Sequence, residues 1–154
     1  MPELPDIVVY VEALEARILG QRLERVRVAS PFLVRTVSPA LDTATGRTVR
    51  AVRRVGKRIA LGTDGGPWLV LHLMIAGRLH WGKPRKKFLA SLDFPNGHLT
   101  LTEAGSERRA ALHVVADPES LDAGGIDVLV SPLPDFARAL SSENHTLKRA
   151  LTDP

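Results

Sequence analysis

The first six residues hold the side chains best suited to chemistry, and they read MPELPD. Removal of Met1, which is usual before a small second residue, leaves a secondary amine on Pro2 beside the carboxylate of Glu3. A terminal amine titrates near ~7.7–8.0, so part of it is unprotonated at neutral pH and can attack an electrophilic carbon. The neighbouring carboxylate can supply or accept the protons that such a reaction moves.

The same residues also have a purely structural interpretation. Pro5 suits the first turn of a helix, where its missing N–H would have no partner in any case. Asp6 complements the positive end of the helix dipole, and Glu3 is then only a first-turn acid. From these six residues alone, both interpretations stay open.

The elements that must position these residues are one helix and many short strands. Apolar residues recur at helical spacing from Leu4 to Ile18, and Gly20 is a natural helix end. The alternation over 88–94, the turn at 95–97 and the alternation of Leu99 with Leu101 predict a hairpin. Further strands are expected at 23–28, 32–37, 49–55, 58–61, 68–75 and 111–115, and helices at 132–140 and after a cap at Asn144. This order predicts a mainly β (α+β) fold, an N-terminal helix followed by an antiparallel β-sandwich or barrel.

Basic residues gather in two stretches of the chain. Residues 22–58 hold ten basic and two acidic residues, and residues 78–87 hold five basic residues and no acid. Residues 116–135 hold five acids and no Lys or Arg. Solvated strand faces are the structural alternative for each stretch. Two basic stretches that flank one apolar segment favour a face that meets nucleic acid.

Composition excludes several classes of protein. The 154 residues are 44% hydrophobic and 25% charged, which is enough for one ordinary domain with a packed core. The absence of Cys excludes a disulfide scaffold, a thiol nucleophile and a cysteine zinc site in this chain. No apolar run, including the one at 68–71, is long enough to cross a bilayer, and no leader pattern opens the sequence. We therefore expect a cytoplasmic protein that has no membrane partner.

Four segments together resemble the formamidopyrimidine-DNA glycosylase and endonuclease-VIII family. The start, MPELPD, is similar to the family's Pro-Glu-Leu-Pro-Glu opening, and RRVGK at 53–57 resembles the strand that carries its essential lysine. HLMIAGRL at 72–79 resembles its His-Leu-Gly-Met-Ser-Gly segment, and NHTLKRAL at 144–151 resembles the entry to its helix–two-turns–helix motif. The segments follow the family's order and span nearly the whole chain.

The resemblance implies an organisation and an activity. Residues 1–131 would form the catalytic N-terminal helix and β-sandwich domain, and residues 132–154 the beginning of the helix–two-turns–helix domain. The implied activity is base-excision repair by a DNA glycosylase with abasic-site lyase activity, which removes oxidised bases through an iminium on Pro2. The implied partner is damaged double-stranded DNA, bound by a monomer associated with the bacterial nucleoid. The family's zinc finger lies beyond the matched segments, so we expect no cofactor or metal in this chain, and weak or no activity from it alone.

Roles follow residue by residue. Pro2 would displace the base, Glu3 would protonate the opening sugar ring, and Lys57 would hold a phosphate or donate a proton. A base in a duplex must be flipped out, and an apolar side chain fills the gap. Ile75 stands where the family has its inserted methionine and Met74 where it has a glycine, so we favour Ile75 as this wedge.

Further DNA contacts are implied by basic side chains. Phosphate contacts are expected from Arg53, Arg54, Arg78 and Lys86. The segment SERRAA at 106–111 stands where the family has Asp-Pro-Arg-Arg-Phe-Gly. Arg108 matches the arginine that faces the orphaned base and Arg109 follows it, whereas Ala110 replaces the aromatic filler.

Two alternatives stay open. A non-catalytic damaged-DNA-binding relative is suggested by the altered segment at 106–111, although Pro2, Glu3 and Lys57 argue against it. A tautomerase-type enzyme would use Pro2 as a base, but it leaves the basic stretches unexplained. Only a lyase forms a covalent adduct with abasic DNA under borohydride, so such trapping separates the three.

Overall fold

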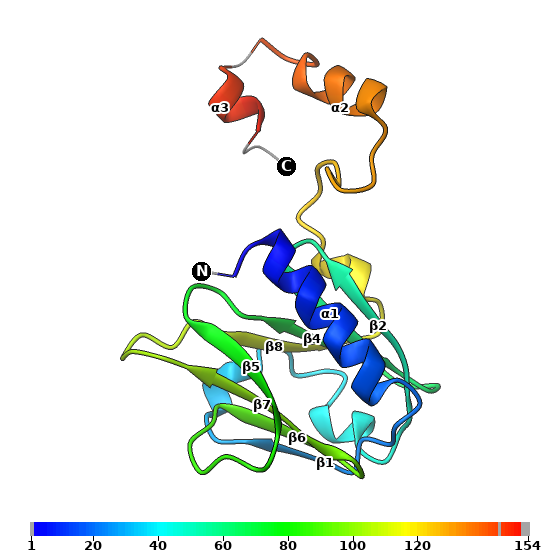
Figure 1. Cartoon of the computed structure of the whole chain (residues 1–154), viewed down its shortest axis with the longest axis vertical. Helices are drawn as coiled ribbons and strands as arrows, with labels where there is room; N and C mark the ends of the chain where they lie inside the picture. The colour runs from blue at the N-terminus through cyan, green and yellow to red at the C-terminus, as the bar shows by residue number, and fades with distance from the viewer. Residues whose placement is uncertain (1, 145, 152–154) are drawn as a thin grey trace. The chain divides into compact units, whose positions relative to one another are not determined.

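The computed structural model describes residues 2–144 and 146–151. The chain forms two compact units, Met1–Ser120 and Leu121–Pro154. The first unit holds the long N-terminal helix and the strands (Figure 1). The boundary between the units falls earlier in the chain than the 131/132 division expected from the sequence, and the functional roles of the two expected domains stay a prediction.

Helix α1 (Leu4–Ile18) has the bounds that its apolar spacing predicts. It packs against strands β2 (Val49–Val55) and β3 (Arg58–Thr63). The chain turns away after the helix, where Gly20 takes a φ of 77°, a conformation that L side chains rarely adopt. The buried positions of the helix are Ile7, Leu14 and Ile18. The packing of this face determines where the first turn of the helix lies.

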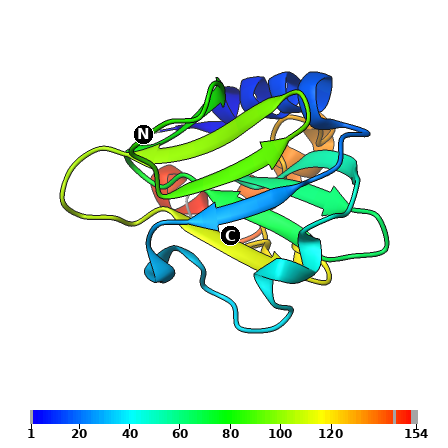
Figure 2. The ribbon, with the colours of Figure 1, turned by 90° about the horizontal axis from the view of Figure 1, so that it is seen from below.

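The strands form two four-stranded antiparallel sheets. One has the order β1 (Arg25–Val28), β6 (Ala90–Phe94), β7 (Gly97–Glu103) and β5 (Gly77–Gly82). The other has the order β2, β3, β4 (Trp68–His72) and β8 (Ala111–Val115). Figures 1 and 2 show the two sheets as two layers with α1 beside them. The fold is therefore the expected helix followed by an antiparallel β-sandwich.

The core lies between the inner faces of the two sheets. Successive side chains of a strand point to opposite faces, so alternate residues meet in the interior. Ile59 pairs with Leu71 where β3 meets β4, and Leu92 pairs with Leu99 where β6 meets β7. The largest fully buried side chains come from α1, from both sheets, and from Leu23 and Leu73 outside them. The core thus joins α1 and the two sheets into one packed body.

Some expected strands end early or do not form. The strand expected at 32–37 is wrong, because Pro31 begins the short 3-10 helix η1 (Pro31–Leu33), for which its fixed φ is suited. Val34 then makes only an isolated bridge to Leu112. The strand expected at 68–75 ends at His72. Two further 3-10 helices are η2 (Leu41–Ala44) and η3 (Pro118–Leu121).

The second unit contains helices α2 (Leu133–Leu140) and α3 (Leu147–Ala150), and α2 confirms the helix expected there. Thr146 caps α3, since its hydroxyl accepts a 3.4 Å hydrogen bond from the Arg149 backbone N–H. The cap expected at Asn144 is therefore wrong, because Thr146 is the residue directly before the helix. Within the described residues, no helix is both long enough and apolar enough to cross a membrane.

Candidate functional site

The N-terminal residues lie at the first turn of α1. Glu3 is the N-cap residue, Pro5 stands in the first turn, and Pro2 is buried. The Glu3 backbone N–H donates a 2.8 Å hydrogen bond to the Asp6 carboxylate, which holds the chain as it enters the helix. Pro2 and Glu3, whose amine and carboxylate could take part in a reaction, thus lie where the helix begins.

Lys57 reaches this turn from a distant part of the chain. It lies at the tight turn between β2 and β3, where Gly56 takes a φ of 55°. Its Nζ is 2.6 Å from a carboxylate oxygen of Glu3, and the two side chains are 47% and 46% exposed. Since Glu3 directly follows Pro2, the structure brings the three predicted catalytic residues to one place.

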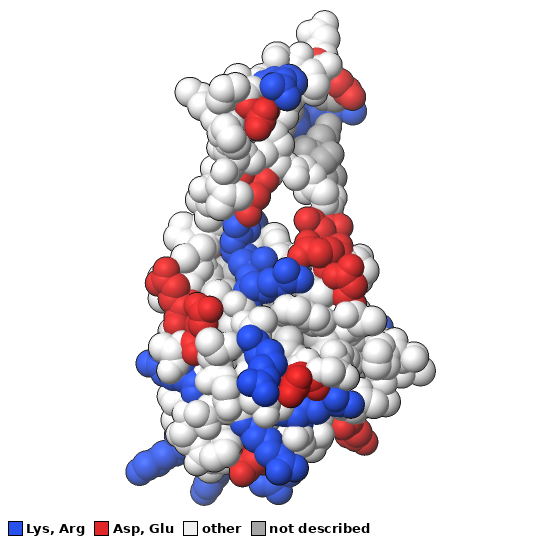
Figure 3. Space-filling model, turned by 90° about the vertical axis from the view of Figure 1, so that its right-hand side faces the viewer, with Lys and Arg blue, Asp and Glu red and all other residues white. Residues whose placement is uncertain are grey.

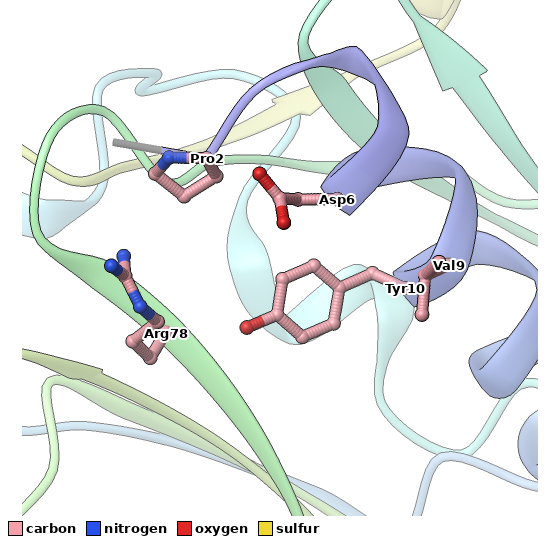
Figure 4. Close-up of a pocket in the computed structure, with 5 residues that line it drawn as sticks. All are labelled: Pro2, Asp6, Val9, Tyr10 and Arg78. Atoms are coloured by element: carbon pink, nitrogen blue, oxygen red, sulfur yellow. The ribbon is translucent and has the colours of Figure 1, made fainter.

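An open cavity of about 440 Å³ lies beside Pro2. Figure 4 shows Asp6 and Tyr10 on α1 facing Arg78 on β5, with Pro2 at the rim. The Leu79 backbone N–H donates to the Tyr10 hydroxyl at 3.4 Å, so Tyr10 also links the helix to β5. A carboxylate, a phenol and a guanidinium therefore surround a hollow next to the N-terminal residue.

Two of these cavity residues are not identified by sequence reasoning. The sequence explains Asp6 as a partner of the helix dipole, and it offers no role for Tyr10. Their spacing of four residues places both side chains on one face of the helix. That spacing, together with the nearness of Asp6 to Pro2 in the chain, is the signal that could have found them.

The loop between β4 and β5 carries the two candidate wedge residues. The Gly77 N–H donates to the Leu73 carbonyl at 2.9 Å and closes the loop. A Cβ on Gly77 would collide with the Leu73 backbone. Met74 has a φ of 53°, the one positive value at a non-glycine residue in the described part of the chain. Ile75 is 53% exposed, so it meets solvent instead of packing in the core.

Arg53 and Arg54 of β2, which are predicted to contact phosphates, already have partners within the protein. The Arg53 guanidinium lies 4.5 Å from the centre of the Trp68 ring and 3.2 Å from the Glu119 carboxylate. Arg54 donates a 3.2 Å hydrogen bond to the Gly56 carbonyl, directly beside Lys57. Arg54 thus lies close to the catalytic candidates, whereas Arg53 connects β2 with β4 and η3.

Lys86 lies on a different loop from Lys57. It is exposed on the segment 83–89, which joins β5 to β6 and passes β7, because β7 stands between those strands in the sheet. The guanidinium carbon of Arg27, on β1, lies 5.3 Å from the centre of the Phe88 ring, which places the end of this segment beside β1. Lys86 therefore lies on the loop that joins β5 to β6, whereas Lys57 lies at the turn between β2 and β3.

Arg108 and Arg109 are exposed on the loop between β7 and β8. The Arg109 guanidinium pairs with Glu107 at 2.7 Å, and the Arg109 backbone N–H donates to the Glu103 carboxylate at 3.0 Å. Basic and acidic side chains also lie close together on the face of the molecule shown in Figure 3. The charge on that face is therefore mixed and not of one sign.

A histidine adjoins the catalytic candidates. Burial, the positive charge of Arg58, the neighbouring His113 and Lys57 together lower the pKa of His72. The neutral imidazole is thus favoured there. Among the residues that the structure describes, no group of three or more His, Cys, Asp or Glu side chains is placed to hold a metal ion.

The sequence and the fold both match known proteins. The family profile of the formamidopyrimidine-DNA glycosylase N-terminal domain matches residues 1–115. A formamidopyrimidine-DNA glycosylase from Acidiphilium cryptum is 31% identical over 170 residues, covering 99% of this chain and 58% of the relative. One from Pelobacter propionicus is 44% identical over 80 residues, covering 51% of this chain and 30% of the relative. This chain therefore spans only part of the length of these relatives.

A solved structure shows the same fold. The complex of wild-type Lactococcus lactis Fpg (MutM) with an oxidised-pyrimidine-containing DNA superposes with a TM-score of 0.70 at 25% identity, covering 78% of this chain and 46% of that chain. Because the family profile also covers most of the sequence, the chain belongs to the formamidopyrimidine-DNA glycosylase family, whose N-terminal domain it contains.

Proposed function

We propose that this chain carries the catalytic part of a DNA glycosylase with abasic-site lyase activity, acting on oxidised bases in double-stranded DNA. The observation that carries the proposal is the 2.6 Å contact between Lys57 and Glu3, directly beside Pro2. Membership of the family supports the same activity. The oxidised-pyrimidine DNA bound by the Lactococcus lactis protein supports the class of substrate.

The reaction begins at Pro2 once Met1 is removed. The lone pair of the secondary amine forms a bond to C1′ of the damaged nucleotide, and the bond from C1′ to the base breaks with its electrons leaving on the base. The nitrogen then loses its proton. Its regained lone pair expels O4′ from C1′, which opens the sugar ring and leaves an iminium between Pro2 and the sugar.

Glu3 carries the protons of these steps. Its carboxylate accepts the proton that the Pro2 nitrogen loses and delivers it to O4′ as the ring opens. It then removes a proton from C2′, after which the 3′ phosphate leaves and the strand is cut. The Lys57 ammonium holds this carboxylate to one position and offers a positive charge to a nearby phosphate.

Other residues hold the DNA in this proposal. Ile75 fills the gap left by the flipped nucleotide, and Met74 shapes the loop that presents it. Arg108 faces the orphaned base, and Arg109 beside it contacts the DNA. Phosphate contacts come from Arg53, Arg54, Arg78 and Lys86. The protein acts as a monomer on chromosomal DNA, in the cytoplasm of a bacterium.

Release of an oxidised base tests this proposal. Duplex DNA with one oxidised base is incubated with excess protein whose Met1 has been removed, and the free base is measured over time. We expect slow base release that follows a single exponential, because this chain alone is expected to be only weakly active. Binding to the damaged duplex without any base release would instead indicate the non-catalytic relative, and the proposal would be wrong.

A further inference from the structure

Two loops that the proposed function brings to DNA meet at one pair of strands. The loop that carries Ile75 ends at Gly77, where β5 begins. The loop that carries Arg108 starts after Glu103, where β7 ends. Gly77 and Glu103 are paired directly in the sheet. Figures 1 and 2 show both loops at the end of the sandwich where α1 begins, so Glu103 lies at their junction.

The Glu103 carboxylate holds the far end of the Arg108 loop. Its Oε1 accepts a 3.0 Å hydrogen bond from the Arg109 backbone N–H, and its two oxygens accept bonds of 3.1 and 3.2 Å from the Ala110 N–H. Hydrogen bonds to a charged acceptor are stronger than those between neutral groups. Since residues 109 and 110 lead into β8 of the other sheet, one side chain of β7 anchors the chain where it crosses between the sheets.

Arg108 depends on this anchor for its position. Residues 104–109 are all exposed, whereas Ala110 is 3% exposed and begins the packed part of the chain. Within the described residues, no hydrogen bond or ion pair restrains the Arg108 side chain itself. The Arg109 N–H belongs to the peptide unit that joins Arg108 to Arg109. The hydrogen bond from Glu103 therefore acts on the backbone directly after Arg108.

We propose that Glu103 is the positioning residue for Arg108: its carboxylate fixes the peptide unit after Arg108, so that the guanidinium meets the orphaned base in one orientation. Because Glu103 also pairs with Gly77, it fixes Arg108 relative to the loop of Ile75. The inference rests on the proposed function, which places Arg108 at the orphaned base.

The contact has a measurable consequence, because an arginine side chain only donates hydrogen bonds. On its free pairing edge cytosine offers two acceptors, O2 and N3, whereas adenine offers the acceptor N1 beside an amino group that donates. A guanidinium held in one orientation therefore distinguishes the two bases, and one that is free to move distinguishes them less.

The test measures binding of the full chain to two abasic duplexes by fluorescence anisotropy, one with cytosine and one with adenine opposite the abasic site. We expect an affinity ratio of about fivefold or more in favour of cytosine, because one good contact between an arginine and a base discriminates by at least this much. The ratio compares two duplexes on the same protein, so any loss of folded protein cancels out of it.

Two variants of Glu103 separate the position of the acceptor from its charge. Glu103→Asp keeps the charge but is one methylene shorter, so the ratio should fall below about twofold as the hydrogen bonds are lost. Glu103→Gln keeps the length and an acceptor oxygen, so it should retain at least about half of the logarithm of the ratio. A loss with Glu103→Gln as large as with Glu103→Asp, or no loss with Glu103→Asp, would overturn the proposal.

A neighbouring acid on the same loop gives the matched control. Glu107 pairs with the Arg109 guanidinium at 2.7 Å instead of holding the backbone, so Glu107→Asp should leave the ratio unchanged. Arg108→Ala should abolish the ratio, and Glu103→Asp added to it should change nothing further, because the two residues act through one contact. An equal effect of Glu103→Asp and Glu107→Asp would overturn the proposal.

Amide hydrogen exchange of the free protein tests the anchor without DNA. In Glu103→Asp, exchange at the N–H groups of Arg109 and Ala110 should become at least about fivefold faster, since the hydrogen bonds that protect them are lost. In Glu103→Gln it should stay within about twofold of the unmodified protein. Equally fast exchange in all three proteins would overturn the anchor and the proposal with it.

Borohydride trapping on abasic DNA tests the proposed function separately. If the adduct forms but the affinity ratio does not respond to Glu103, this inference alone is wrong. If the ratio responds to Glu103 but no adduct forms, the lyase proposal alone is wrong. Equal binding of both duplexes by the unmodified chain would remove the role given to Arg108, and this inference with it.

Discussion

The Nζ of Lys57 lies 2.6 Å from a carboxylate oxygen of Glu3, although the two residues are far apart in the sequence. They meet because α1 packs against both strands that flank the turn of Lys57. Each side chain is about half exposed, so solvent screens their attraction and the pair adds little to stability. In the proposed reaction its value lies in position, since it holds the Glu3 carboxylate beside Pro2.

Glu3→Gln keeps the shape of the side chain but removes its ability to move protons. We expect the rate of base release to fall about 100-fold or more, within the usual range for general acid–base catalysis. Cleavage of a preformed abasic site should fall less, because its sugar ring opens in water without Glu3 and only the proton on C2′ is left for this residue to remove. Single-turnover rates on the two duplexes measure the difference. Glu15→Gln, on an exposed position of the same helix, should change neither rate, and equal losses on both duplexes would contradict the role given to Glu3.

Asp93 of β6 is a buried carboxylate, 4% exposed, that accepts hydrogen bonds from several side chains. Burial raises the pKa of its carboxyl, but hydrogen bonds from Arg27, His98, Ser91 and Arg25 outweigh burial and hold the pKa well below its usual range. The folded-state pKa is therefore lower than that of the unfolded chain. The resulting stabilisation is present above about pH 4 and is lost as the pH falls toward the folded-state value.

Asp93→Asn should therefore lower the free energy of unfolding by about 2 kcal/mol at neutral pH, because it weakens the charge-assisted hydrogen bonds that the partly exposed Arg25 and Arg27 donate to this buried carboxylate. Urea unfolding at neutral pH and again below about pH 3 measures this difference, which should shrink in acid. Asp64→Asn is the matched control, because the Arg50–Asp64 pair is 63% and 60% exposed and should matter little. An Asp93→Asn effect that stays constant down to low pH would contradict the assignment.

Met74 adopts a left-handed conformation that favours glycine. Met74→Gly should relieve this strain and raise the free energy of unfolding by up to about 1 kcal/mol, whereas Met74→Val should lower it. Urea unfolding of the two variants beside the unmodified chain tests the sign of each change. If Met74→Gly did not raise the free energy of unfolding above that of the unmodified chain, the loop would carry no strain at this residue.

Ile75 is exposed at the same loop, so its role can be separated from folding. Ile75→Ala should leave unfolding unchanged but weaken binding to an abasic duplex several-fold, because the gap in the base stack loses its filler. Val37, which is 95% exposed, offers the matched control Val37→Ala. Anisotropy with abasic and intact duplexes measures the effect. Equal weakening on both duplexes would contradict a wedge.

Local patterns in the sequence predict the helices and strands but not which of them contact one another. The apolar spacing from Leu4 to Ile18 determines α1, because it depends only on neighbours along the chain. The hairpin around 95–97 follows from its turn residues in the same way, and Phe94 pairs with Gly97 there. The segment 32–37 is rich in residues that favour strands, yet Pro31 starts a 3-10 turn and only Val34 reaches an isolated bridge partner.

The site depends on contacts that no local pattern contains. Only the family resemblance suggests that Lys57 lies near Pro2, and the structure adds that Lys57 contacts Glu3. The cavity needs β5 to lie across from α1, so the facing pair of Asp6 and Arg78 has no sequence signal of its own. Asp93 lies within the alternating segment at 88–94, but that alternation does not indicate that its charged side chain is buried.

The most direct test of the central claim is reductive trapping on an abasic duplex. The protein is first shown by mass spectrometry to lack Met1, then incubated with the duplex and borohydride, and the adduct is mapped to a residue. We expect a covalent link at the nitrogen of Pro2, and no adduct from a sample that retains Met1. An adduct on Lys57, or none from protein with a free Pro2, would contradict the role of Pro2 as the nucleophile.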